Sequence, residues 1–135
     1  MQNLIQKINP EWPLRLGLGL MYLYSGFGLF YYPYDWYGFL PNWFSQLVSQ
    51  VAPVEAYLRL QGAGEFLIGL LFLAWFSGVW GLRAASILAT VEIAFILLFV
   101  GIDLITFRDI GLLGGAIAIL IISFGEEPPV RQVQG

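Results

Sequence analysis

Four long apolar segments, separated by short polar stretches, constrain this chain more than any other feature of its sequence. They span residues 13–32, 54–76, 82–101 and 107–124. A helix needs about 20 mostly apolar residues to cross the roughly 30 Å hydrocarbon core of a bilayer. The sequence therefore predicts an all-α membrane protein, in which residues 1–135 form a single domain built as a four-transmembrane-helix bundle.

Composition excludes several other classes of protein. Charged residues make up only 11% of the chain, against about 25% in soluble domains, so polar groups cannot cover the surface of a soluble fold. The net charge of -3 argues against nucleic-acid binding. The chain has no Cys and no His, which leaves no usual ligands for haem or zinc and no thiol. No metal site is predicted, and no catalytic set is recognisable.

The placement of Lys and Arg predicts the orientation in the membrane. With four crossings, both termini share one side of the bilayer, which holds Lys7, Arg15, Arg83 and Arg131. The other side holds Arg59 and Arg108. The positive-inside rule then places both termini in the cytoplasm. We expect an amphipathic turn at residues 4–8 and a polar tail at 125–135. The expected membrane anchors are Trp12, Arg15, Trp43 and Arg83.

The outer loop at residues 33–53 is dense in Tyr, Trp and Phe and includes Asp35 and Trp36. Such rings prefer the headgroup level of a bilayer. Trp43, Leu47 and Val51 recur at a spacing of four, which predicts an interfacial helix after Pro41. Two interpretations stay open: the loop anchors the protein to the membrane surface, or it forms a lid over a cavity between the helices.

Two acidic residues lie well inside the predicted spans, away from their ends. Glu92 is near the middle of the third span, where an acidic group costs roughly 3 kcal/mol, so we expect it to face the bundle interior, either protonated or paired. Glu65 lies in the second span, with Gln61 one turn earlier on the same face. Glu92 could be a neutral packing residue as readily as a functional one. The two carboxyl groups could share a proton, bind a cation or hydrogen-bond a polar ligand head.

The connection between the third and fourth segments suggests a further cluster. Thr106 and Asp109 have the spacing of a capping box. Asp103 at a helix end and Arg108 at a helix start each oppose the local helix dipole, which a pair between them would explain, as would pairing of Arg108 with Glu65 or Asp35. We expect an outer cluster that contains Arg59, Glu65, Asp103, Arg108 and Asp109.

Glycines mark the predicted packing seams, where helix backbones can approach closely. In the first segment they are Gly17, Gly19, Gly26 and Gly28; Gly62, Gly64 and Gly69 surround Glu65, and Gly111 with Gly115 forms a GxxxG motif. No internal repeat is evident.

Several motifs together resemble the DoxX family over residues 12–125. They are Arg15 opening the first segment, GAGEFLIGLLFL in the second, LRAASIL opening the third and FRDIGLLGGAIAIL in the fourth. The resemblance implies a small four-helix membrane protein, with relatives that include a subunit of an archaeal thiosulfate:quinone oxidoreductase and others linked to complexes that handle oxidative stress. Arg15, Glu65, Arg83 and Asp109 match positions where the family commonly has such residues, whereas Glu92 does not.

Three functions follow as hypotheses. The first is an accessory or scaffold subunit of a membrane complex, with redox chemistry a candidate activity of that complex. The second is a quinone-linked oxidoreductase component, with the quinone head near Arg59, Glu65 and Arg108 at the outer helix ends. The third is a carrier of a small solute or proton that uses Glu65 and Glu92. We expect a prokaryotic cell membrane as the location. The expected partners are the lipid bilayer and either a membrane or peripheral protein or a second copy of the chain.

Overall fold

The structure is a computed structural model that describes residues 9–125, and every regular element in this part of the chain is helical. The elements are α2 (Glu11–Tyr31), η1 (Pro33–Phe39), α3 (Asn42–Ser49), α4 (Val54–Leu73), η2 (Trp75–Ser77), α5 (Gly78–Phe99), η3 (Thr106–Arg108) and α6 (Asp109–Gly125). The predicted turn at residues 4–8 and the predicted tail beyond Gly125 lie outside the described residues.

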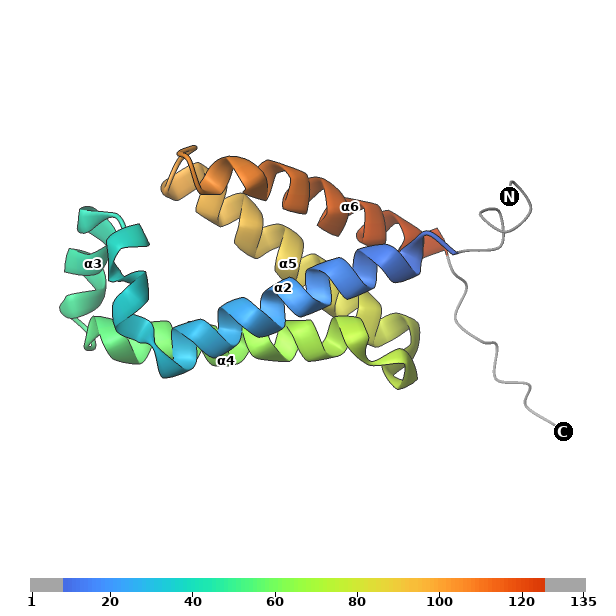
Figure 1. Cartoon of the computed structure of the whole chain (residues 1–135), viewed down its shortest axis with the longest axis horizontal. Helices are drawn as coiled ribbons and strands as arrows, with labels where there is room; N and C mark the ends of the chain where they lie inside the picture. The colour runs from blue at the N-terminus through green and yellow to red at the C-terminus, as the bar shows by residue number, and fades with distance from the viewer. Residues whose placement is uncertain (1–8, 126–135) are drawn as a thin grey trace, which may run out of the picture.

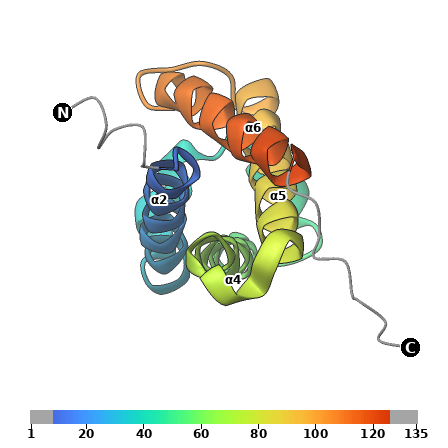
Figure 2. The same ribbon diagram turned by 90° about the vertical axis from the view of Figure 1, so that its right-hand side faces the viewer.

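The four long helices form two antiparallel pairs. Viewed from one end, α2, α4, α5 and α6 follow one another around a ring, so that α2 lies opposite α5 and α4 opposite α6 (Figure 2). Helix α2 packs chiefly on α4, and α5 packs chiefly on α6. The two pairs diverge towards the end that carries α3 (Figure 1). A buried core joins all four helices and includes Tyr22, Phe72, Leu82 and Ile119.

Three helical stretches are long and apolar enough to cross a membrane: Val54–Leu73, Trp75–Phe99 and Thr106–Gly125. Helix α2 has 21 residues but is not among the three. Its glycines and tyrosines are less apolar than the Leu, Ile and Phe side chains that dominate the other helices. The structure therefore confirms the predicted all-helical class and contains three candidate membrane spans.

Glycines allow α2 and α4 to pack backbone against backbone. A Cβ atom on Gly26 would lie 2.5 Å from the Phe66 nitrogen, and one on Gly69 would lie 2.9 Å from the Gly19 carbonyl oxygen. A Cβ atom on Gly62 would likewise lie 2.7 Å from the Gly26 carbonyl oxygen. The predicted seam between the first two long helices is thus present.

The predicted GxxxG contact in α6 is different. A Cβ atom on Gly111 would meet nothing within 4 Å, and one on Gly115 would reach only leucine side chains at 3.8 Å or more. The motif therefore makes no close backbone contact within residues 9–125, because Gly111 faces open space and Gly115 faces leucine side chains of α2 rather than a helix backbone. Gly17 and Gly64 are likewise open, and Gly28 is covered by the Trp36 ring.

The interfacial helix predicted after Pro41 is present as α3, although Val51 lies beyond its end. It packs on α4 through Phe44 and Tyr57, whose rings lie 5.2 Å apart. Trp43 reaches Phe99 at the end of α5, with 6.1 Å between ring centroids. Helix α3 therefore bridges the two helix pairs where they diverge, while Trp43 itself stays half exposed.

Candidate functional site

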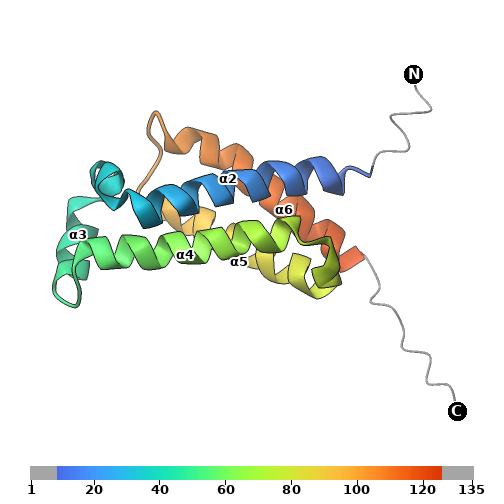
Figure 3. The ribbon, with the colours of Figure 1, turned by 60° about the horizontal axis from the view of Figure 1, so that its bottom comes forward.

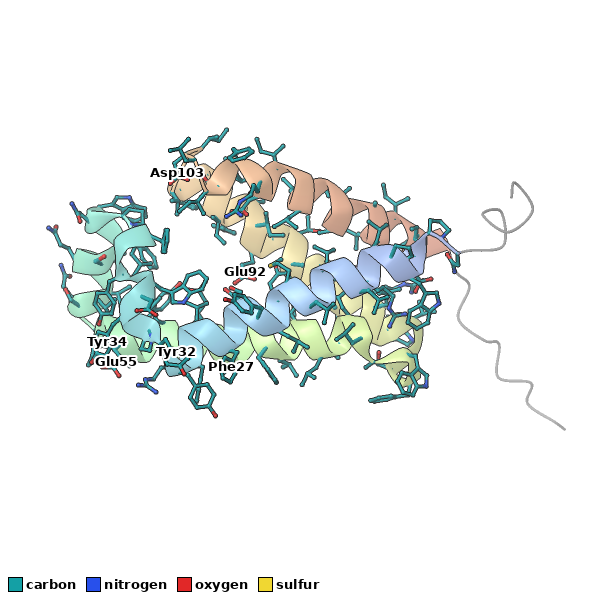
Figure 4. All side chains as sticks on the ribbon, in the orientation of Figure 1. Phe27, Tyr32, Tyr34, Glu55, Glu92 and Asp103 are labelled. Carbon is teal, nitrogen blue, oxygen red and sulfur yellow. The ribbon has the colours of Figure 1, made fainter. Side chains whose placement is uncertain are left out.

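A cavity of about 290 Å³ lies between α4 and α5, and we call it the polar cavity. Its lining consists of Gln61, Gly64, Glu65, Ile68, Leu88, Val91 and Glu92. The three polar members are all sequence-predicted candidates, and the structure brings them to one place. In Figure 4, Glu92 points into the space between the helix pairs. No residue of the aromatic loop lines the polar cavity, so the loop is not its lid.

Both oxygen atoms of the Glu65 carboxyl group have hydrogen-bond partners. The Gln61 amide donates to Oε1 over 3.1 Å, as the one-turn spacing of the two residues predicts. The Ser25 hydroxyl, which comes from α2, donates to Oε2. Glu65 is only 5% exposed, so these two donors replace the water that the carboxyl group has lost. Sequence reasoning missed Ser25, because a single Ser within an apolar segment carries no distinguishing signal.

Glu92 differs from Glu65 in its hydrogen bonding. Its Oε2 atom is buried and has no hydrogen-bond partner. The nearby Tyr22 hydroxyl donates to the Ala89 carbonyl oxygen over 3.4 Å. Tyr22, Gln61 and Glu65 all lie close enough to Glu92 for hydrogen-bond interactions with its carboxyl group. Within residues 9–125 no group of three or more His, Cys, Asp or Glu side chains could hold a metal ion. The polar cavity is thus equipped for hydrogen bonding and contains an acceptor that has no donor.

The predicted outer cluster does not form. Arg59 pairs with Glu55 one turn earlier, with 2.8 Å between its terminal nitrogen and Oε1, because both side chains lie on the same face of α4. The Tyr34 hydroxyl donates to the other Glu55 oxygen over 2.8 Å, and this bond raises the pKa of Tyr34 above its ordinary value. Glu65 lies further along α4 and bonds to other partners.

Asp103 and Thr106 form the capping box that was predicted at Thr106 and Asp109. The Thr106 backbone N–H donates to Asp103 Oδ1 and the Asp103 backbone N–H donates to Thr106 Oγ1, both over 2.8 Å. The backbone N–H groups of Thr106 and Ile105, which both donate to Asp103 Oδ1, lower the pKa of its carboxyl group. Asp103 therefore caps the start of the η3–α6 segment rather than ending α5, which is why it needs no partner in Arg108.

The remaining outer candidates form no single cluster: Asp103 and Arg108 interact electrostatically with Asp109 at the start of α6, whereas Arg59 pairs with Glu55 on α4. Arg108 Nε donates to the Ile105 carbonyl oxygen over 3.3 Å, and no ion pair joins it to Asp35, Glu65 or Asp103 in the described part of the chain. Asp109 opens α6. Asp103 and Glu55 lie on opposite sides of this end of the molecule (Figure 4). Asp35 is exposed, and Trp36 packs on Gly28 away from the polar cavity.

Arg15 is a buried clamp between helices rather than a surface anchor. It is 6% exposed, pairs with Glu11 at 2.8 Å, and donates to the Phe72 carbonyl oxygen over 2.7 Å and to that of Ala74 over 3.2 Å. The last carbonyl groups of a helix lack partners within it, and a cation there also offsets the helix dipole.

Arg83 has the equivalent position in the second helix pair. It lies in the first part of α5, and its Nε atom donates to the Ser123 carbonyl oxygen near the end of α6 over 3.0 Å. Each arginine also lies over the Trp ring three residues before it, Arg15 over Trp12 at 5.0 Å and Arg83 over Trp80 at 5.2 Å. The same four-residue pattern accompanies both arrangements in the sequence, WPLR at 12–15 and WGLR at 80–83.

No family model matches the chain, and neither the curated proteins nor the solved structures contain a significant match. Fold and site together define the class as an all-helical protein with three candidate membrane spans and a polar cavity between two of them.

Proposed function

We propose that the protein is a four-span integral membrane protein that holds a lipid-soluble, quinone-type molecule in the polar cavity, as an accessory subunit of a membrane redox complex. One observation carries the proposal. Two carboxyl groups and an amide line a cavity of about 290 Å³ at mid-length of two helices that are long and apolar enough to cross a bilayer. Ionisable groups at that depth are expensive and generally serve a function.

The packing of α2 supports its assignment as the fourth span. It lies antiparallel to α4, from Gly19 beside Gly69 to Gly26 beside Gly62, and the two helices run together along most of their lengths (Figure 3). A helix packed backbone to backbone against a membrane span crosses the bilayer with it. Exposed aromatic rings occur at both ends of the bundle, as at membrane interfaces: Trp12, Trp75 and Trp80 at one end, and Tyr31, Tyr34 and Trp43 at the other.

Charge placement supports the orientation. Arg15 and Arg83 share the end at which α2 and α5 begin, whereas Arg59 and Arg108 belong to the other end. By the positive-inside rule, the end with Arg15 and Arg83 faces the cytoplasm. The resemblance to the DoxX family favours a prokaryotic cell membrane.

The choice of ligand rests on size, polarity and the DoxX resemblance. Binding cavities for small molecules start at about 300 Å³, so the polar cavity suits the ring of one head group and leaves a hydrophobic tail in the lipid. The chain has no Cys or His to ligate a haem or an iron–sulfur cluster, so a partner subunit would carry the electrons. A carrier is less favoured, because α2, α4, α5 and α6 are each unbroken between their ends and many transporters bind substrate at interrupted helices.

The test is purification from native membranes in mild detergent, followed by mass spectrometry of the bound proteins, lipids and quinones. We expect the wild-type chain to carry a quinone-type molecule and at least one protein partner. Glu65→Gln should lose the small molecule, because its amide offers one acceptor oxygen where Gln61 and Ser25 need two, so the side chains that line the polar cavity must rearrange. Glu55→Gln is the matched control, since it makes the same change on the same helix outside the polar cavity. A protein that purifies alone, with no quinone-type molecule, contradicts the proposal.

A further inference from the structure

The polar cavity opens sideways, between α4 and α5. Of its apolar lining residues, Leu88 and Val91 are each 49% exposed, and Gly64 is exposed as well. These residues lie on the outer surface of the bundle, which faces lipid if α4 and α5 cross the membrane. A molecule dissolved in the bilayer can therefore reach the opening of the polar cavity without passing through either end of the bundle.

Counting donors and acceptors defines what is missing in the polar cavity. Glu65 accepts one bond at each oxygen, whereas Glu92 Oε2 accepts none although it is buried. The other buried side-chain atom without a partner in the described residues is Thr90 Oγ1, which does not line the polar cavity. A buried acceptor without a donor costs about 1–3 kcal/mol, and a ligand that brings a donor removes that cost.

We propose that the polar cavity selects a head group that donates a hydrogen bond, namely the hydroxyl of a lipid-soluble phenol, which arrives from the bilayer between α4 and α5 and donates to Glu92 Oε2. The inference rests on the proposed function and names the chemical form of the head: the hydroxylated ring of a reduced quinone is bound, and a ring whose oxygens only accept hydrogen bonds is bound more weakly.

Gly64 provides a steric test of the sideways route. It lines the polar cavity, and a Cβ atom on it would meet nothing within 4 Å. A larger side chain at residue 64 can therefore narrow the opening without displacing the helix backbone. Gly17 is the matched control, because it is equally open but lies on α2 and outside the lining.

The experiment compares two probes that differ in whether the ring oxygen carries a hydrogen or a methyl group, and decylquinone is titrated as a third molecule that tests the proposed function alone. Radiolabelled 4-nonylphenol and its methyl ether, 4-nonylanisole, are titrated into the full chain in lipid nanodiscs, and binding to empty nanodiscs is subtracted. We expect saturable binding of the phenol that is about 10-fold tighter, or more, than binding of the ether, as for one hydrogen bond to a buried carboxyl group. Glu92→Leu should remove this preference. Gly64→Leu should abolish saturable binding, and Gly17→Leu should leave it unchanged.

Each outcome separates the inference from the proposed function. Equal binding of phenol and ether, or a preference that survives Glu92→Leu, overturns the selection of a donor, while binding of decylquinone would leave the proposed function standing. If none of the three molecules binds saturably, both proposals fail. Wild-type affinity in Gly64→Leu overturns the sideways route. If Gly64→Leu does not fold, Gly64→Ala adds a single carbon in open space and should weaken binding measurably; unchanged affinity in that variant also contradicts the route.

Discussion

Replacement of Glu92 by Leu should stabilise the protein, although Glu92 lies at the centre of the candidate site. Glu92 Oε2 is buried without a partner, and such an atom costs about 1–3 kcal/mol. Leu is close to Glu in size and needs no hydrogen bond, so Glu92→Leu should raise the free energy of unfolding by about that amount. In a chain of this length each kcal/mol corresponds to a melting-temperature shift of about 4 °C.

Replacement of the neighbouring Glu65 by Leu should instead lower the free energy of unfolding. Glu65 accepts hydrogen bonds from Gln61 and Ser25, so Glu65→Leu leaves two donors in the bundle interior without an acceptor. We expect a loss of about 1–3 kcal/mol. Glu92→Gln is the isosteric control and should give little or none of the gain, because its amide also needs partners.

The assay is thermal unfolding in detergent, followed by the fluorescence of the five Trp residues, none of which lines the polar cavity. Bound small molecules are extracted first, so that loss of a ligand does not mask the gain. If Glu92→Leu lowers the melting temperature as Glu65→Leu does, Glu92 is stabilised by its surroundings, and the reasoning that assigns it to a ligand is refuted.

Three further predictions concern the scaffold. Arg15→Ala should cost about 3–5 kcal/mol, because it leaves the buried Glu11 carboxylate without its cation and the Phe72 carbonyl oxygen without its donor. Arg59→Ala removes a pair of the same length and spacing whose side chains are 41% and 32% exposed and should lower the melting temperature far less, with thermal unfolding as the measurement. Gly26→Ala should destabilise by about 1–3 kcal/mol, since its new Cβ would lie 2.5 Å from a backbone nitrogen; equal melting temperatures for this variant and Gly17→Ala would contradict the seam. The stabilisation from Asp103 should be complete at neutral pH and lost as the pH falls through its lowered pKa; Asp103→Asn should keep the cap and flatten this loss in melting curves recorded against pH.

The sequence predicted those features that depend on a single helix. Helix lengths, the helix after Pro41 and the Gln61–Glu65 pair follow from local spacing, and the glycine seam follows from residue size. Contacts between elements were harder to predict, because they depend on how each helix is rotated about its axis. Sequence spacing could not show that Arg15 turns towards the end of α4, or that Ser25 faces Glu65. The outer cluster was wrong for the same reason, since residues at one depth in a membrane need not share a side of the bundle.

The two arginine clamps have a consequence for how the molecule is assembled. Residues 32–53 join α2 to α4 at one end, and Arg15 closes the same pair at the other; residues 100–108 and Arg83 do the same for α5 and α6. Each half is thus a helical hairpin in which an arginine of the first helix satisfies a carbonyl group at the end of the second. Under the four-span topology proposed above, each hairpin can enter a bilayer as a unit during synthesis. The polar cavity takes one wall from each hairpin. The polar cavity therefore forms only when the second hairpin docks on the first. A ligand bound in it would indicate that the two hairpins have assembled.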